Sequence, residues 1–269
     1  MARANRHYLP GYVWHITHRC HKKEFLLKFS KDRKRLIQWL FEAKKRYGLT
    51  ILNYIVTSNH IHLLVVDTHQ DVIPKSIQLI AGRTGQEYNQ RKNRKGAFWE
   101  DRYHATAVQT DRHLLSCMIY IDLNMVRAGV VKHPSEWEMS GYHEIINPPQ
   151  RYALIDHVRL GNILGFSDSD RATLICTYKH LLDEALQNNS LHRQEAWTES
   201  IAVGSNEFIS ETKRNLASRA IGRDILNNNG VFELREPSVP YSVHFDRKKN
   251  VLRLENTYFW NINNDISTG

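Results

Sequence analysis

The stretch from residue 49 to residue 66 most constrains the fold, because it holds two β-prone runs separated by Ser58-Asn59. A two-residue connection predicts that strands 49–57 and 60–66 pair as a tight antiparallel hairpin. Side chains alternate between the two faces of a strand, so His60 and His62 would share one face while Leu63 faces a core. Two neighbouring imidazoles on a buried strand could form half of a divalent-metal site.

The histidine spacing alone is a weak signal. A chain with 15 histidines is expected to contain about one such pair by chance, which is the risk with every short motif. A pair of surface or edge histidines therefore remains the alternative at this point.

The order of the remaining elements predicts the fold class. Residues 11–20 alternate as a first strand, and a helix follows from Ser30 to Gly48. After the hairpin come a helix over 72–91 and a strand over 103–109. This β-α-β-β-α-β order is typical of a ferredoxin-like α+β fold, an antiparallel sheet with helices on one face.

A further helix is predicted between Asp111, a suitable N-cap, and Gly129, a suitable end. Its apolar stripe must face the core and contains Leu114, Met118, Ile121 and Met125. Tyr120 and Asn124, one turn apart, lie on a different stripe together with Arg127. A tyrosine that only packs would be expected on the apolar stripe, so Tyr120 is a candidate for chemistry, although packing remains possible.

These side chains together suit phosphoryl transfer. A metal held by His60, His62 and the Asn124 side-chain oxygen would polarise a phosphodiester. Tyr120 would attack phosphorus and form a covalent phosphotyrosine. Arg127 would assist or hold phosphate. Because such an intermediate keeps the energy of the phosphodiester, the chemistry suits breaking and rejoining strands.

The charge of the chain favours an anionic partner. The net charge is +9 and the pI is near 9.4, which indicates nucleic acid before membrane. No apolar run is long enough to span a membrane. The absence of a secretory signal and the odd number of three cysteines predict a cytoplasmic, nucleoid-associated protein.

A basic loop over residues 91–96 is followed at once by Phe98 and Trp99, which suits phosphate contacts and base stacking. A solvated charge run is the alternative. The predicted DNA-contacting residues are Arg3, Arg6, Arg91, Lys92, Arg94, Lys95, Arg102, Tyr103 and Arg127. His15, His18, Cys20 and His21 could suggest zinc, but no second Cys-His pair answers them and the strand spacing is out of step.

The chain resembles the REP-associated tyrosine transposases of the HUH single-strand transposase superfamily. The resemblance is carried by Met1-Ala2-Arg3, Leu9-Pro10-Gly11 with His15-Ile16-Thr17, Ser58-Asn59-His60-Ile61-His62-Leu63-Leu64, residues 98–103, residues 120–129, and the later Lys132-His133-Pro134-Ser135-Glu136-Trp137. It implies a ferredoxin-like core, Mg²⁺ or Mn²⁺ at two histidines plus a polar helix residue, a tyrosine nucleophile, and single-stranded DNA next to hairpins as substrate.

The chain departs from that family's pattern at three places. Met125 replaces the proline that commonly follows the asparagine, and Ser58 replaces the proline before Asn59. Glu100-Asp101 stand where a glycine is expected. None of these changes removes a proposed ligand or the nucleophile.

Residues 1–150 are predicted to form the catalytic domain, and residues 151–269 an extension that is mainly helical to about residue 225 and then irregular. Three functions remain open: a metal-dependent transposase, a hairpin-binding protein of the same fold without activity, and a phosphodiesterase that uses water. The protein is expected to be a monomer or homodimer.

Overall fold

The computed structural model of the chain describes residues 9–188, 193–228 and 230–236. The strands are β1 (Val13–Arg19), β2 (Thr50–Val56), β3 (His60–Val66), β4 (His104–Val108), β5 (Ala202–Gly204), β6 (Asp224–Asn228) and β7 (Val231–Arg235). The helices are α1 (Ser30–Tyr47), α2 (Val72–Arg91), α3 (Arg112–Asp122), α4 (Asn124–Arg127), α5 (Tyr142–Ile146), α6 (His157–Ile163), α7 (Arg171–Gln187), α8 (Ala196–Glu199) and α9 (Asn206–Leu216).

The predicted ferredoxin-like core is confirmed. The strands form one sheet in the order β2-β3-β1-β4-β5-β7-β6, and the first four are antiparallel neighbours. The hairpin of β2 and β3 is also confirmed, with Val56 opposite Ile61. Its connection has three residues, 57–59, because Thr57 leaves the strand and its Oγ1 accepts a hydrogen bond from the His60 amide at 3.0 Å.

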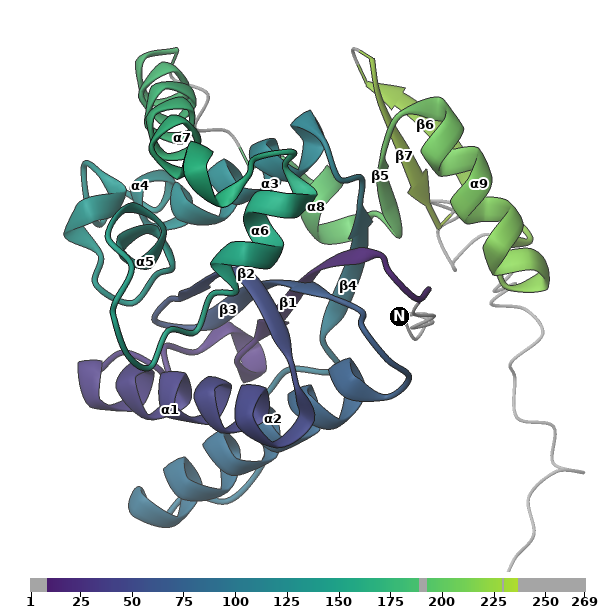
Figure 1. Cartoon of the computed structure of the whole chain (residues 1–269). Helices are drawn as coiled ribbons and strands as arrows, with labels where there is room; N and C mark the ends of the chain where they lie inside the picture. The colour runs from purple at the N-terminus through teal and green to yellow at the C-terminus, as the bar shows by residue number, and fades with distance from the viewer. Residues whose placement is uncertain (1–8, 189–192, 229, 237–269) are drawn as a thin grey trace, which may run out of the picture. The chain divides into compact units, whose positions relative to one another are not determined.

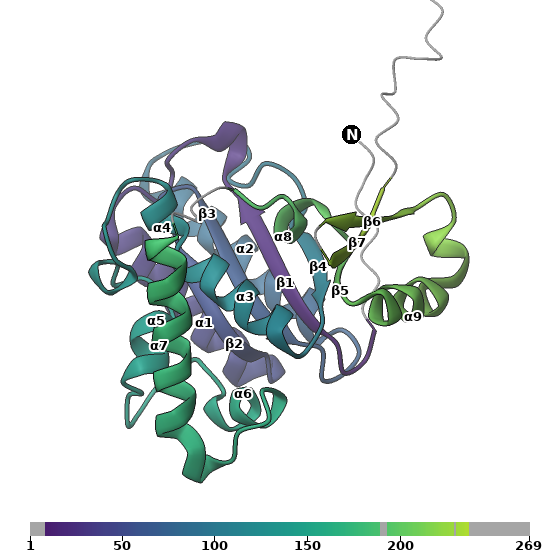
Figure 2. The same cartoon turned by 90° about the horizontal axis from the view of Figure 1, so that it is seen from above.

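Helices cover both faces of this sheet. α1 and α2 lie on one face, as predicted, and α3 crosses the other (Figures 1 and 2). The histidine face of β3 is therefore buried beneath α3, and both Leu63 and Leu64 are fully buried. The added helix α3 makes a second core on the face of β3 that carries His62 (Figure 2).

Local sequence signals set the ends of these helices. α1 ends at Gly48, whose φ of 71° is the left-handed conformation that glycine adopts readily. α3 begins after Asp111, whose side chain accepts a hydrogen bond from the His113 amide at 2.9 Å. The single helix expected up to Gly129 is corrected: Leu123 separates α3 from the short α4.

The extension after residue 150 differs from the prediction. It contains α6, α7, α8 and α9, but it also contains β5, β6 and β7, which continue the catalytic sheet. β5 pairs in parallel with β4 through Ala107–Ala202 and Val108–Val203. The described residues up to 236 belong to one compact unit. Strands from both sides of residue 150 share one sheet, so residue 150 does not separate two folding units. The division at residue 150 stays a proposed division of function.

No helix in the described ranges is both long and apolar enough to cross a membrane. The part of the extension beyond residue 236, which the sequence predicts to be irregular, lies outside the described residues.

Candidate active site

The two histidines of the sequence motif lie side by side at the start of β3. Their ring centroids are 4.9 Å apart and the rings are nearly perpendicular. His60 Nδ1 lies 2.7 Å from Asn59 Oδ1, and the Asn59 amide is oriented by the hydrogen bond that its Nδ2 donates to the Lys23 carbonyl at 3.1 Å. Because an amide oxygen only accepts, His60 Nδ1 carries the hydrogen, and Nε2 keeps a lone pair for a metal.

Register explains a third histidine in the cluster. β1 pairs with β3 so that Thr17 is opposite His62 and His15 is opposite Leu64. His15 and His62 are therefore diagonal neighbours on one face. Their rings are nearly parallel, and His15 Nε2 lies 2.8 Å from His62 Nδ1.

Burial keeps these imidazoles neutral. Desolvation lowers the pKa of His15 to about 3 and that of His60 to about 4. The pKa of His62 also falls well below its ordinary value, first because of burial and then because of the neighbouring histidines. Metal binding requires neutral imidazole, so the donor set suits a divalent ion.

Tyr120 on α3 lies against this cluster. Its ring centroid is 6.0 Å from that of His62 and 6.1 Å from that of His15. The Arg127 guanidinium stacks over the ring at 4.0 Å and donates a hydrogen bond to the Tyr120 carbonyl at 2.7 Å. Tyr120 is only 6% exposed. Burial raises the pKa of the phenol, and the charge of Arg127 opposes that rise, so the phenol is protonated at neutral pH.

Asn124 reaches the same cluster from the other side of the helix break. Its Nδ2 lies 3.0 Å from His62 Nε2. Rotation of the amide by 180° would present its oxygen to the same place. The structure therefore brings together Tyr120, His60, His62, Asn124 and Arg127, which the sequence analysis had singled out.

The helix break next to the site has a buried carboxyl at its centre. Asp122 is 1% exposed and accepts hydrogen bonds from Asn53 Nδ2 at 3.1 Å and from the Tyr178 hydroxyl. Burial raises the pKa of Asp122 to about 7, against the opposing effect of these hydrogen bonds. Sequence reasoning missed this group, because Asn53 and Tyr178 lie far from Asp122 in the chain.

Among the predicted DNA contacts, the aromatic ones are corrected. Tyr103 is 5% exposed and Phe98 is 4% exposed, so neither offers a face to a base. Trp99 is stacked on His18, with ring centroids 4.2 Å apart. The aromatic residues Phe98 and Trp99 pack against His18 of β1 and Tyr88 of α2.

The basic residues predicted to contact DNA have different surroundings. Arg91 pairs with Asp32, and Arg94 donates to Asn89 Oδ1 and the Ala97 carbonyl, so both have structural contacts. Lys92 lies over the Phe29 ring at 5.4 Å. Lys95 and Arg102 are exposed. The predicted contacts Arg3 and Arg6 lie outside the described residues.

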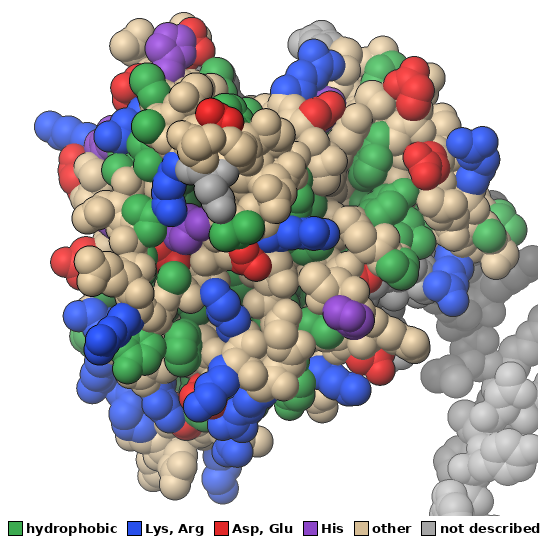
Figure 3. Space-filling model, viewed as in Figure 1, with side chains coloured by type: hydrophobic (Ala, Val, Ile, Leu, Met, Phe, Trp, Pro, Cys, Tyr) green, Lys and Arg blue, Asp and Glu red, His purple; other side chains and the backbone are tan. Residues whose placement is uncertain are grey.

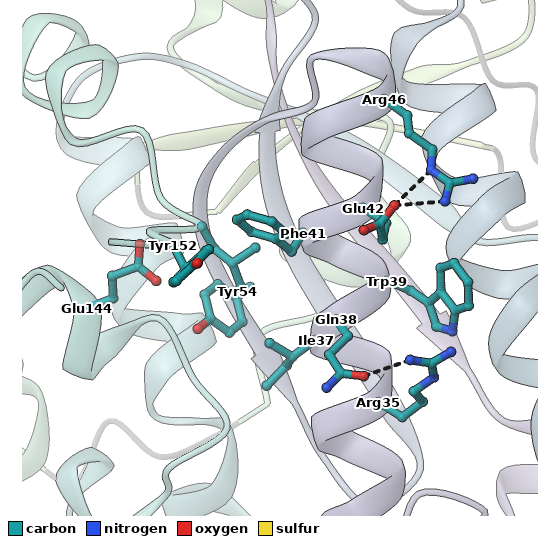
Figure 4. Close-up of a pocket in the computed structure, with 11 residues that line it drawn as sticks. Arg35, Ile37, Gln38, Trp39, Phe41, Glu42, Arg46, Tyr54, Glu144 and Tyr152 are labelled. Carbon is teal, nitrogen blue, oxygen red and sulfur yellow. Dashed lines mark hydrogen bonds and ion pairs between the residues drawn. The ribbon is translucent and has the colours of Figure 1, made fainter. Parts of the chain in front are cut away.

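A groove of about 630 Å³ lies elsewhere, between α1 and β2. Phe41, Tyr54 and Tyr152 gather at one end of it, and Arg46 pairs with Glu42 farther along α1 (Figure 4). None of its lining residues belongs to the histidine cluster.

Within the described ranges, no group of three or more His, Cys, Asp or Glu side chains is arranged to hold a metal ion. The site of interest has a different donor set, two imidazoles and one amide. His60 and His62 would hold an ion through Nε2, and Asn124 through its side-chain oxygen.

A family model matches the part of the chain that carries His60, His62, Tyr120 and Asn124. Residues 10–124 match the family model described as "Transposase IS200 like". A solved structure of a REP-associated tyrosine transposase bound to a REP hairpin is similar, with 20% identity, a TM-score of 0.47, and coverage of 54% of this chain and 86% of that chain. A crystal structure of a proposed transposase from Deinococcus radiodurans R1 is also similar, with 20% identity, a TM-score of 0.31, and coverage of 39% and 85%. No curated protein matches the chain.

Proposed function

We propose that this protein cleaves and rejoins single-stranded DNA next to hairpins, because residues 10–124 match the family model described as "Transposase IS200 like". Tyr120 would be the nucleophile, and His60, His62 and Asn124 would hold Mg²⁺ or Mn²⁺. The observation that carries the proposal is the contact of Tyr120 with His62, whose ring centroids are 6.0 Å apart, while the His60 ring lies 4.9 Å from that of His62.

The chemistry follows from the groups present. The Tyr120 oxygen attacks phosphorus, the bond from phosphorus to the 3′-oxygen breaks, and the phenolic proton is lost while the 3′-oxygen gains one. A 5′-phosphotyrosine and a free 3′-hydroxyl result, and the reverse step joins a new 3′-hydroxyl. A divalent ion would stabilise the charge that develops on the phosphate.

Arg127 supports the nucleophile in two ways. It lies over the ring at 4.0 Å and fixes the backbone of Tyr120 by a 2.7 Å hydrogen bond. Its charge also favours the phenolate, which counteracts the rise in the pKa of Tyr120 caused by burial.

Charge supports DNA as the partner. The protein carries a net charge of +9, and Lys and Arg side chains gather over α1 and α2 in the space-filling view (Figure 3). Lys95 and Arg102 add exposed charge after α2. The proposed preference for hairpins rests on the sequence resemblance. The proposed cytoplasmic, nucleoid-associated location rests on the cysteine count and the N-terminal sequence, and the proposed oligomeric state is a monomer or homodimer.

An inactive hairpin-binding protein is the second candidate. The 6% exposure of Tyr120 favours it, because a phosphodiester must reach the phenol before it can react. A phosphodiesterase that uses water would instead leave Tyr120 as a packing residue.

Cleavage of a hairpin-bearing single-stranded oligonucleotide tests the proposal. The parent should cleave with Mg²⁺ or Mn²⁺ and not with chelator, while His60→Ala and His62→Ala should bind the hairpin but not cleave it, because imidazole ligation is lost. His143→Ala, at an exposed position, is the matched control and should cleave like the parent. Binding without cleavage under any metal would favour the inactive protein.

A further inference from the structure

Both ring nitrogens of His62 have a neighbour within hydrogen-bond distance. One of these neighbours, His15, is in turn bonded to the backbone of the extension. His62 Nδ1 lies 2.8 Å from His15 Nε2, and His62 Nε2 lies 3.0 Å from Asn124 Nδ2. At the other side of the His15 ring, Nδ1 lies 2.8 Å from the Trp197 carbonyl oxygen. A continuous chain of hydrogen bonds therefore runs from the backbone of α8 to the predicted ligand.

The donor and the acceptor of each hydrogen bond in this series can be assigned by starting from the Trp197 carbonyl oxygen. A carbonyl oxygen only accepts, so His15 Nδ1 must carry a hydrogen. His15 is 0% exposed, and a second proton on its ring would bury a cation at high cost. His15 Nε2 therefore keeps its lone pair and accepts the hydrogen of His62 Nδ1. The remaining lone pair of His62 lies at Nε2, facing Asn124.

The Trp197 carbonyl, where this series of hydrogen bonds starts, lies in a well-packed part of the protein. The Trp197 side chain is 3% exposed and its ring lies 6.3 Å from that of Tyr120. Thr106 Oγ1 donates to the Ser200 carbonyl at 2.7 Å and approaches the Trp197 carbonyl at 3.3 Å. The pairing of β4 with β5 holds the backbone just after this turn.

We propose that His15 is a positioning residue that, anchored by the Trp197 carbonyl, fixes His62 in the Nδ1–H tautomer and so presents Nε2 for a divalent metal. His60 reaches the same state by the separate contact with Asn59. The extension thereby becomes part of the site, since Trp197 lies outside the family-matched residues 10–124. The inference that this His62 tautomer serves metal binding rests on the proposed function, whereas the assignment of the tautomer itself does not.

The first test reads the tautomer directly. Long-range proton–nitrogen NMR of the metal-free, ¹⁵N-histidine-labelled protein distinguishes the two ring nitrogens, and His62→Gln assigns the signal. We expect a protonated Nδ1 and an unprotonated Nε2 on His62. The opposite tautomer would overturn the inference.

The second test measures Mn²⁺ binding by electron paramagnetic resonance. His15→Phe keeps a ring but removes both nitrogens, and it should weaken Mn²⁺ binding about 10- to 100-fold, as loss of a ligand's outer partner does. His15→Gln can donate to the carbonyl and accept from His62, so it should restore binding to nearly that of the parent. His104→Phe is the matched control, because His104 also contacts a backbone carbonyl of the extension, Ser200, at 2.9 Å. It should bind Mn²⁺ like the parent.

The outcomes separate the inference from the proposed function. Parent-like Mn²⁺ binding by His15→Phe would overturn the positioning role, and so would equal losses in His15→Phe and His15→Gln. If His15→Phe fails to fold, the His62 tautomer in the parent and Mn²⁺ binding by His15→Gln still test the positioning role of His15. A parent that binds no Mn²⁺ and cleaves no DNA would refute the proposed function, while the NMR result would still test the hydrogen-bond chain.

Discussion

Acidification from pH 6 to pH 5 should destabilise the folded protein, because its site histidines stay neutral while the same residues charge in the unfolded chain. His15 and His62 are 0% and 3% exposed, and burial lowers the pKa of each. A group with a lowered pKa contributes stability that is present above its unfolded pKa and is lost as the pH falls below it. For these histidines the loss begins near the ordinary pKa of 6.5.

The size of the effect follows from linkage. Between pH 6 and pH 5, a histidine that stays neutral only when folded costs about 1 kcal/mol, so His15 and His60, whose pKa values fall to about 3 and about 4, together cost about 2 kcal/mol. Asp122 acts in the opposite sense. Its pKa rises from 3.8 to about 7 on folding, so it gains a proton preferentially in the folded state and offsets about 1 kcal/mol over the same interval. The net loss should be at least about 1 kcal/mol, and His62, whose pKa is also lowered, adds to it.

The assay is urea unfolding in chelator at pH 6.0 and pH 5.0, comparing the parent with Asp122→Asn. The substitution removes the opposing carboxyl and should increase the loss of unfolding free energy to at least about 2 kcal/mol. An unfolding free energy in Asp122→Asn that is unchanged or higher at pH 5.0 would refute the claim that the site histidines are neutral when folded.

Three other changes have definite expected results. Lys92→Gln with Lys95→Gln should weaken single-stranded DNA binding and reduce the slope of log affinity against log salt by up to about 1.4; an unchanged slope would show that these lysines contact no phosphate. Arg91→Gln leaves Asp32 without its ion pair and should lower the unfolding free energy by about 1–3 kcal/mol, whereas parent-like urea unfolding would contradict that. Trp197→Ala removes a side chain that is 3% exposed and should cost about 3–5 kcal/mol, seen as a lower Tm; an unchanged Tm would argue against its packing role.

Periodicity and end signals predicted the core of the fold. Alternation identified β1 and β4, and β-prone composition identified β2 and β3. Gly48 and Asp111 marked helix ends that the structure confirms. These signals are local, so they can be read without tertiary contacts. The face shared by His60 and His62 followed from strand geometry alone.

The features that sequence reasoning missed depend on distant contacts. The helix break at Leu123 adjoins Asp122, which accepts a hydrogen bond from Tyr178 on α7. The local sequence contains no glycine or proline that would predict this break. β5 has only three residues, too few for a visible alternation. The contact of His15 with Trp197 joins residues 182 positions apart, and the register that places His15 beside His62 could not be read from either strand alone.

Tyr103 shows how one pattern can have two causes. An aromatic residue after a basic loop suits base stacking, yet the ring is 5% exposed. Burial against the protein core and presentation to a base suit the same residue type, and only the position of neighbouring elements separates them.

The most direct measurement of the central claim is a search for a covalent link between Tyr120 and DNA. The protein is incubated with a hairpin-bearing single-stranded oligonucleotide and Mn²⁺, denatured, digested and mapped by mass spectrometry. Tyr120→Phe keeps the ring beneath Arg127 but removes the attacking oxygen, and Tyr142→Phe is the matched control at another buried tyrosine. We expect a 5′-phosphate adduct on Tyr120 in the parent and in Tyr142→Phe, and none in Tyr120→Phe. Cleavage by Tyr120→Phe at the rate of the parent, with hydrolysed ends and no adduct, would contradict the role of Tyr120 as nucleophile.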